Sequence, residues 1–322
     1  MNISFLDGYT INPGDLDWGD LSQLGHLTVY DRTAPDEVLA RAGDADVVIV
    51  NKTALQRAHF ESLPRLKLVC VAATGYDRID LQAADVHGVT VTNCAGYSSR
   101  AVAQLVASFV LEVADSVGEY AEADRQGRWC QSPDFCYTLR RRVELVGKKL
   151  AVVGFGNIGQ AVTDVMRPFG LQLHAVTSKG QEALPADVRK LTMEEAFADM
   201  DFVSLNCPLT DANRGFVNAA LLRHSNPRLV LINTARGGIV SEQDVADALK
   251  EERLGAYCAD VLAEEPPRES CPLLSAPRCF ITPHIGWNTP EARRRIILIL
   301  VDHIRNFLAG RPTGVVNHPA GA

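Results

Sequence analysis

The sequence lacks a long hydrophobic run and a recognisable leader. Its longest apolar stretch, residues 101–118, is interrupted by Gln104, Glu112 and Asp115. A membrane-spanning helix needs roughly 18 predominantly apolar residues, so this stretch is expected to be a buried helix. The first residues, MNISFLDGYT, show no basic segment followed by an apolar core, which argues against a secretory signal. We therefore expect a cytoplasmic protein with no membrane partner.

The chain also lacks an excess of positive charge and any paired cysteines. Its net charge is -7, and its lysines and arginines are scattered, so a nucleic-acid partner is not expected. The one basic cluster, residues 140–142, is interpreted as a solvated loop or a subunit contact. The eight cysteines include no CxxC pair, and neither Cys nor His recurs at a metal-ligand spacing. Reduced core thiols and no metal site are predicted.

Short apolar runs alternate with helical patterns along all 322 residues, a length that suits two domains. This alternation predicts parallel sheets covered by helices on both faces. The first series of predicted strands is 3–7, 27–30, 46–50, 66–73 and 89–93. The second series, which begins after Lys148, is 149–156, 171–177, 201–208, 229–233, 255–261 and 279–284.

The two series predict an α/β protein with two Rossmann-like, doubly wound parallel-sheet domains. Two long helices, 97–118 and 289–308, are placed to link them. If the last segment packs on the first series, that domain is discontinuous and the second is inserted in it, which the pattern alone leaves open. The expected boundaries are then 1–98 with 287–322 for a substrate domain, and 99–286 for a dinucleotide-binding domain.

A glycine-rich turn opens the second series. In VVGFGNIGQ, Gly154, Gly156 and Gly159 follow a predicted strand and precede a helical pattern, with Asn157 and Ile158 between the last two glycines. The first glycine permits the tight turn, the second lets a pyrophosphate approach the backbone, and the third allows close helix–strand packing. The context favours a dinucleotide site. A glycine turn without ligand and an S-adenosylmethionine loop are the alternatives.

The identity of the dinucleotide is open. An acidic residue is expected about 20 residues after the glycine turn, where it would bind the ribose hydroxyls of NAD. Here the next strand ends in Thr177, Ser178 and Lys179, which would accept the 2′-phosphate of NADP. The cofactor is therefore NADP or NAD, with NADP weakly favoured, unless backbone groups alone hold the ribose.

Three later strand ends carry polar residues that are unusual in such places. Arg236 follows LVLIN, Asp260 ends a strand with Glu265 shortly after it, and His284 follows CFIT. Ligands bind at the carboxyl ends of strands in an open parallel sheet, so these side chains should share an edge with the glycine turn. Each alone has an ordinary structural interpretation, as a solvated turn, a cap or a core histidine.

Together, these residues supply a coherent reaction. A 2-oxo acid presents a carboxylate and a carbonyl oxygen, both of which suit the forked guanidinium of Arg236. Hydride delivery to the carbonyl carbon develops an alkoxide, and a charged imidazole such as that of His284 can protonate it. A neighbouring carboxylate, here Glu265, would stabilise the charged imidazole and orient its ring.

The sequence resembles the D-isomer-specific 2-hydroxyacid dehydrogenases along essentially the whole chain. The resemblance is carried by VVGFGNIGQAV, VSLNCPLT, LINTARGGIV, ADVLAEEPP with PLL, and ITPHIGW. The stretches LDGYTINPGDLDW, NKT, ATGYDRID and SPDFC are most similar to the glycerate dehydrogenase (hydroxypyruvate reductase) branch. The resemblance implies a discontinuous substrate domain and a homodimer built largely on the cofactor domain.

The resemblance also implies residue roles. Arg236 would bind the substrate, His284 would be the acid/base, and Glu265 would be its partner. The backbone at Thr74 and Gly75 would hold the substrate carboxylate. Lys52 matches a frequent cation near the substrate, although an exposed loop lysine is an equal alternative. The remaining positions implied to face the cofactor are Cys207, Pro208, Thr234, Ala235, Asp260 and Gly286.

The sequence departs from the family pattern at three places. Thr177 stands where many members have the ribose-binding Asp, Asn213 stands where Thr is usual, and residues 137–149 lack the common aromatic, proline-rich arm. The expected activity is NAD(P)H-dependent reduction of a small 2-oxo acid, with hydroxypyruvate or glyoxylate as first candidates. A non-catalytic NAD(H)-sensing regulator or corepressor is the alternative, and a related formate or phosphite oxidation is a third possibility.

Overall fold

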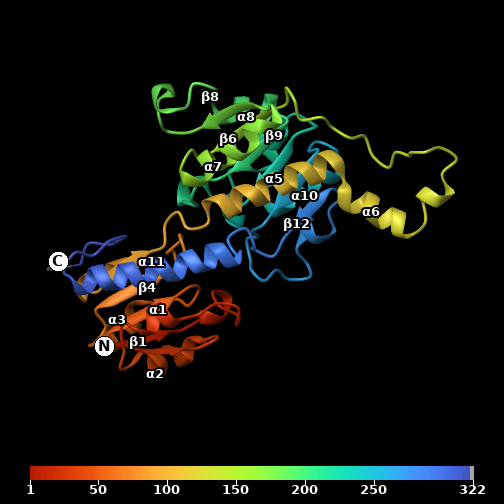
Figure 1. The fold of residues 1–322 in the computed structure, drawn as a ribbon. Helices are drawn as coiled ribbons and strands as arrows, with labels where there is room; N and C mark the ends of the chain where they lie inside the picture. The colour runs from red at the N-terminus through yellow and green to blue at the C-terminus, as the bar shows by residue number, and fades with distance from the viewer. Residues whose placement is uncertain (320–322) are drawn as a thin grey trace. The chain divides into compact units, whose positions relative to one another are not determined.

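The computed structural model of the protein describes residues 1–319 and divides the chain into two compact units (Figure 1). The first unit combines Met1–Ser98 with the segment from Asn288 onward, and the second is Ser99–Trp287. Each unit contains one sheet in which all paired strands are parallel, so the predicted fold class is confirmed. The second unit is inserted between the two segments of the first.

The first unit has a five-stranded sheet in the order β2-β1-β3-β4-β5. Its strands are Asn2–Phe5 (β1), His26–Val29 (β2), Val47–Val50 (β3), Leu68–Val71 (β4) and Thr90–Asn93 (β5). Its helices are Gly19–Ser22 (α1), Val38–Ala42 (α2), Arg57–Ser62 (α3), Leu81–Val86 (α4) and Pro290–Leu308 (α11). Strands β3, β4 and β5 are buried along their whole length, which accounts for their apolar or β-branched residues up to Asn93, the polar last residue of β5.

The long helix α11 begins as its sequence predicts. Thr289 caps it, because its Oγ accepts a hydrogen bond from the Ala292 N–H at 3.2 Å, and Pro290 occupies the first helical position. Arg293, only 5% exposed, donates from two guanidinium nitrogens to the two carboxylate oxygens of Asp15 at 2.7 and 2.6 Å. This bidentate pair fixes the N-terminal loop of the first unit to α11.

The second unit has a seven-stranded sheet in the order β12-β11-β10-β9-β6-β7-β8. Its strands are Lys149–Val153 (β6), Gln172–Val176 (β7), Val188–Lys190 (β8), Phe202–Leu205 (β9), Val230–Asn233 (β10), Ala256–Ala259 (β11) and Cys279–Ile281 (β12). Its helices are Ser99–Asp115 (α5), Val117–Arg125 (α6), Asn157–Met166 (α7), Met193–Asp199 (α8), Ala219–Leu222 (α9) and Glu242–Lys250 (α10). The edge strand β8 was not predicted, because two of its three residues are exposed and basic.

The predicted helix 97–118 is wrong in its C-terminal part. Helix α5 ends at Asp115, Ser116 adopts a left-handed conformation (φ +52°), and α6 leaves at a bend of 57°. In the described residues no single helix is long and apolar enough to cross a membrane, whereas α5 and α6 taken together pass on length and composition alone. The basic cluster that follows is exposed and pairs locally: Arg140 with Glu119, and Arg142 with Asp115.

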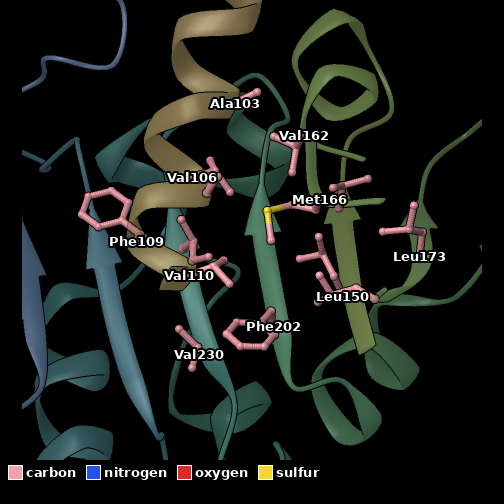
Figure 2. Close-up of a cluster of buried hydrophobic side chains, with 14 of the residues drawn as sticks. Ala103, Val106, Phe109, Val110, Leu150, Val162, Met166, Leu173, Phe202 and Val230 are labelled. Atoms are coloured by element: carbon pink, nitrogen blue, oxygen red, sulfur yellow. The ribbon is translucent and has the colours of Figure 1, made fainter. Parts of the chain in front are cut away.

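A hydrophobic cluster between α5, α7 and one face of the sheet forms one of the two buried clusters of the second unit (Figure 2). Helix α5 contributes Val106 and Val110, which share this cluster with Met166 of α7 and Phe202 of β9. Burying each such side chain stabilises the fold by roughly 1.5–3 kcal/mol. The cluster fixes the strands against the helices, and thereby the loops at their carboxyl ends.

Candidate active site

The functional residues predicted for the second unit lie at one edge of its sheet. Strands β6, β7, β9, β10, β11 and β12 run parallel, so their carboxyl ends share that edge. The residues that follow these strand ends are Gly154, Thr177, Cys207, Arg236, Asp260 and His284. Residues spread over 130 positions of the chain are therefore brought to adjacent loops.

The glycine turn has the geometry that a bound pyrophosphate requires. Gly154 has φ +96°, and a Cβ there would lie 2.8 Å from the carbonyl oxygen of Asn206. A Cβ on Gly159 would lie 2.1 Å from the carbonyl oxygen of Gly154, so only glycine lets α7 pack this closely. A Cβ on Gly156 would meet nothing within 4 Å. The exposed backbone of Gly156 and Asn157 therefore fits an approaching phosphate at the start of α7.

Two lysines flank the end of β7, where the ribose of a dinucleotide is expected. Lys179 donates from Nζ to the carbonyl oxygen of Phe155 in the glycine turn at 2.9 Å. Lys190, on the unpredicted strand β8, donates from Nζ to the carbonyl oxygen of Lys179 at 2.6 Å. The Lys179 N–H also donates to the Thr177 hydroxyl at 3.2 Å. The two positively charged lysines are compatible with a phosphate on the ribose. Ser178 lies between Thr177 and Lys179 in an exposed turn.

The loop after β9 is closed by Asn213, for which the sequence predicts no role. The Asn213 side chain donates to the Pro208 carbonyl oxygen at 2.8 Å and accepts from the Thr210 N–H at 2.7 Å. Its amide nitrogen also lies 3.9 Å from the Cys207 sulfur. Burial raises the pKa of the Cys207 thiol, which therefore stays protonated. Asn213 shapes the loop that carries Cys207 and Pro208.

Glu265 and His284 form a hydrogen-bonded pair. The Nδ1 atom of His284 lies 2.6 Å from Oε2 of Glu265, while Oε1 of the same carboxylate accepts from the Leu262 N–H at 3.0 Å. The side chains are 25% and 36% exposed, so solvent or a ligand can reach the imidazole. His284 has φ +54°, a left-handed conformation that is rare for residues with a side chain. The bond to Glu265 fixes Nδ1 and leaves Nε2 as the nitrogen that can exchange a proton.

Asp260 stabilises the turn that carries His284. Its carboxylate, only 3% exposed, accepts from the N–H groups of Ile285 and Gly286 at 2.8 Å each and from the Thr282 hydroxyl at 2.6 Å. A Cβ on Gly286 would lie 3.0 Å from that carboxylate. The buried negative charge is thus satisfied by backbone donors, and these bonds hold the strained conformation of the turn.

Arg236 emerges from a turn organised by Asn233, a fully buried residue that the sequence did not single out. The Asn233 side chain donates to the Arg236 carbonyl oxygen at 3.0 Å and accepts from the Ala235 N–H at 3.1 Å. Arg236 itself donates from Nη1 to the Ala235 carbonyl oxygen at 2.8 Å. The Thr234 hydroxyl is buried without a hydrogen-bond partner in the described residues. Asn233 could have been found from the sequence, because a polar residue at the end of a buried strand needs hydrogen-bond partners.

The glycine after Arg236 is explained by a close backbone contact. A Cβ on Gly237 would lie 1.9 Å from the carbonyl carbon of Leu262 and 2.3 Å from the nitrogen of Ala263. The turn after β10 therefore packs directly on the segment that leads to Glu265. This contact joins the strand end that bears the guanidinium to the one that bears the carboxylate.

In the first unit, Asp7 organises the loop that carries Lys52. The Asp7 carboxylate accepts three consecutive backbone N–H bonds, from Asn51 at 2.7 Å, Lys52 at 2.6 Å and Thr53 at 2.7 Å. The loop residues line a small pocket together with Gly75 and other residues that follow β4. Lys52 is exposed at this pocket, and Asp7 is another residue for which the sequence predicts no role.

The backbone predicted to hold a carboxylate lies in the loop after β4. Asn93 donates from its side chain to the Thr74 carbonyl oxygen at 2.6 Å, and the Thr74 hydroxyl donates to the Cys94 carbonyl oxygen at 3.1 Å. Within residues 1–319, the N–H groups of Thr74 and Gly75 donate to no protein acceptor. Successive unpaired N–H groups of this kind can bind an anion.

The second unit is a dinucleotide-binding α/β domain by its glycine turn and strand order. The family model for the NAD-binding domain of D-isomer specific 2-hydroxyacid dehydrogenases matches residues 107–286. The chain is 37% identical to a hydroxypyruvate reductase of Blautia hydrogenotrophica, over 98% of this chain and all of that protein. It is also 32% identical to a glycerate dehydrogenase of Methylorubrum extorquens, over 89% and 90% of the two chains.

A solved structure titled as an acyclic imino acid reductase in complex with NADPH and D-Arg has a TM-score of 0.87 and 25% identity. The alignment covers 98% of this chain and all of that one. The chain belongs to the D-isomer specific 2-hydroxyacid dehydrogenase family, as the sequence motifs predicted. The matched domain indicates a nicotinamide cofactor, for which Gly154, Gly156 and Gly159 supply a fitting turn.

Proposed function

We propose that the protein is an NAD(P)H-dependent reductase of small 2-oxo acids, with hydroxypyruvate and glyoxylate as its first candidate substrates. The observation that carries this proposal is the bond of 2.6 Å between His284 and Glu265 at the sheet edge that also bears Arg236 and the glycine turn. The relatives named hydroxypyruvate reductase and glycerate dehydrogenase support the substrate class. The products would be D-glycerate and glycolate.

The reduction needs a proton as well as a hydride. The reduced nicotinamide, when bound, supplies the hydride to the carbonyl carbon. His284, charged and held through Nδ1 by Glu265, gives its Nε2 proton to the carbonyl oxygen, so that a hydroxyl forms as the carbon–oxygen double bond is lost. The neutral imidazole then takes a proton from solvent. In the reverse direction the same nitrogen acts as the base.

Substrate binding is assigned to groups from both sheets. The guanidinium of Arg236 would bind the carboxylate and the carbonyl oxygen, which also withdraws electrons from the carbon under attack. The free N–H groups of Thr74 and Gly75 would hold the carboxylate, and Lys52 would add positive charge. Asp260, Gly286, Thr234 and Ala235 would border the nicotinamide, with Cys207 and Pro208 beside it.

The proposed cofactor is NADPH or NADH, and NADPH is favoured by the absence of a carboxylate among Thr177, Ser178 and Lys179. Lys190 strengthens this preference, because its ammonium lies against the Lys179 carbonyl oxygen. The test compares kcat/KM for the two cofactors in the wild type and in Lys179→Ala. A selective loss with NADPH supports the proposal, whereas equal losses with both cofactors contradict a 2′-phosphate contact.

We further propose a homodimer in the cytoplasm. The arm after α6 exposes large apolar side chains, with Trp129 56% and Phe135 89% exposed, which would be costly in an isolated chain. Size-exclusion chromatography with light scattering tests the assembly. A monomer at micromolar concentration would contradict it.

The function is tested by following reduced nicotinamide at about 340 nm, the wavelength at which it absorbs, with 2-oxo acids, formate and phosphite as substrates. Turnover of hydroxypyruvate or glyoxylate supports the proposal, and turnover of formate or phosphite instead replaces it. Tight cofactor binding with no turnover of any substrate favours the alternative of an NAD(H)-sensing regulator or corepressor.

His284→Ala is the decisive variant for the mechanism. Loss of a positioned acid should lower kcat by roughly 10²–10⁴-fold, while circular dichroism shows the fold intact. Arg236→Ala should mainly raise the KM for the 2-oxo acid. A His284→Ala enzyme with wild-type kcat would show that another group donates the proton.

A further inference from the structure

The short segment around Leu262 and Ala263 is held by neighbouring residues at the candidate active site. Gly237 packs against it, so closely that any Cβ would collide with the carbonyl carbon of Leu262. The Leu262 N–H donates to Oε1 of Glu265 at 3.0 Å. The Ala263 N–H donates to a residue outside the known motifs, Oε1 of Glu242, at 2.7 Å.

Glu242 is well placed to act as a fixed anchor. It is the first residue of α10, a helix of nine residues whose N-cap, Ser241, accepts a hydrogen bond from the Asp244 N–H. A carboxylate in this first turn is stabilised by the helix dipole. The second oxygen of Glu242 accepts a hydrogen bond from the Cys271 thiol at 3.6 Å, so the side chain is held from two directions.

The contacts form a continuous path from α10 to the imidazole. Glu242 binds the Ala263 N–H, the adjacent Leu262 N–H binds Glu265, and the other oxygen of Glu265 binds Nδ1 of His284. Ala263 and Glu265 are exposed and lie in a segment without helix or strand, so few apolar contacts restrain them. We propose that Glu242 is a positioning residue, which holds the 262–265 segment so that Glu265 meets the imidazole of His284.

The hydrogen bond at Ala263 requires a side chain at position 242 that is long enough to bring an acceptor oxygen to the Ala263 N–H, and a neutral oxygen can accept it as well. Glutamine keeps a carbonyl oxygen at the same reach, whereas aspartate keeps the charge but is shorter by one methylene. Alanine removes the acceptor altogether. These three substitutions at Glu242 therefore separate reach, charge and the presence of the hydrogen bond.

The proposal rests on the proposed role of His284 as the acid, and the kinetic test uses the full-length protein with hydroxypyruvate and reduced cofactor. Glu242→Ala and Glu242→Asp should lower kcat by roughly 10-fold to 100-fold, because the pair loses its alignment, with a smaller change in KM. Glu242→Gln should restore kcat to near the wild-type value. Asp247→Ala is the matched control, since in the part of the chain that the structure describes this carboxylate on the same helix pairs with Gln243 and Lys250.

A second measurement does not depend on turnover. In protein labelled with nitrogen-15 in its histidines, ring chemical shifts report which nitrogen of His284 carries the proton, with His284→Gln assigning the signal. The wild type and Glu242→Gln should hold the neutral ring as the Nδ1–H tautomer, because Glu265 accepts that proton. Glu242→Ala and Glu242→Asp should shift the ring toward the Nε2–H tautomer.

The outcomes separate the two proposals. If the wild type reduces no 2-oxo acid but the tautomer still depends on Glu242, the proposed function is wrong and the positioning role stands. An unchanged tautomer and unchanged kcat in Glu242→Ala would overturn the positioning role, even if the melting temperature falls. Equal losses in Glu242→Gln and Glu242→Ala would also overturn it, because charge rather than the hydrogen bond would then matter. If Glu242→Ala does not fold, Glu242→Asp decides.

Discussion

The two sheets differ in what lies at the point where the strand order reverses. Strand order reverses between β1 and β3 in the first unit and between β6 and β9 in the second, and such reversals open a crevice where ligands bind. In the second unit a glycine turn follows β6, and its backbone is left for an anion from outside. In the first unit Asp7 follows β1, and its own carboxylate accepts the N–H bonds of Asn51, Lys52 and Thr53.

The difference shows how one architecture gives two kinds of site. In the described residues, the Asp7 carboxylate accepts the N–H bonds of Asn51, Lys52 and Thr53, so these three donors are not available to a pyrophosphate. Its candidate donors lie one strand further along, at Thr74 and Gly75. The second unit keeps its crevice for the dinucleotide and places its charged side chains beyond it, after β10, β11 and β12.

Placing a carboxylate in the glycine turn should make the second unit resemble the first, with a negative charge where the pyrophosphate is expected to bind. Gly156→Asp is tolerated by the backbone, because Gly156 has an extended conformation and open space where the side chain would lie. Two like charges about 4 Å apart cost roughly 4 kcal/mol at an effective dielectric constant near 20, so cofactor affinity should fall by roughly 100-fold or more. Titration of reduced nicotinamide fluorescence measures this.

Gly156→Ala is the matched control and should weaken binding less, since it adds bulk without charge. A folded Gly156→Asp protein that binds the cofactor as tightly as the wild type would show that the pyrophosphate lies elsewhere. Melting temperature, measured without cofactor, should be nearly the same in all three proteins.

Removing the internal carboxylate should affect the first unit alone. Asp7→Ala leaves three N–H groups without their acceptor, and with partial replacement by water this should destabilise the protein by about 2–4 kcal/mol. Urea unfolding measures the loss, and Asp7→Asn, which keeps one acceptor oxygen, should lose less. The KM for the 2-oxo acid should rise as the Lys52 loop loosens, whereas cofactor affinity should stay unchanged. A fall in cofactor affinity would contradict the separation of the two crevices.

The sequence predicted the parts of this protein that depend on local patterns. The apolar strands, the glycine turn and the cap of α11 each occupy a short stretch whose residue types are dictated by backbone geometry. The carboxyl ends of parallel strands share one edge of the sheet, so Arg236 and His284 could be placed at that edge from the sequence. The edge strand β8 was not predicted, because it is mostly polar and only three residues long.

The residues that hold the site in place could not be found in this way. Asp7 acts on a loop 44 to 46 positions away, and Glu242 acts on a residue 21 positions away. A single carboxylate at a helix start or after a strand has no pattern that distinguishes an anchor from a surface residue. The end of α5 was not predicted for a related reason. The apolar spacing continues past Ser116, whereas the helix ends where Ser116 adopts a left-handed backbone conformation.

The smallest expected effect is on the pH dependence of stability, to which each unit contributes one buried histidine. Burial lowers the pKa of His174 on β7 in the second unit and of His303 on α11 in the first. As pH falls below about 6.5, the ordinary value, the unfolded chain takes up protons that the folded protein does not. Stability should therefore be complete above that pH and decline, by at most about 1.4 kcal/mol per pH unit for each histidine, until the lowered pKa is reached.

Urea unfolding at a series of pH values from neutral to mildly acidic would measure this decline in the wild type, His174→Gln and His303→Gln. Each substitution removes one titrating group, so the decline should become shallower. His87→Gln is the control for the substitution itself, because the His87 side chain is exposed. If both buried variants retain the wild-type slope, acid sensitivity comes from other groups. If only His303→Gln makes the decline shallower, the histidine of the first unit accounts for it.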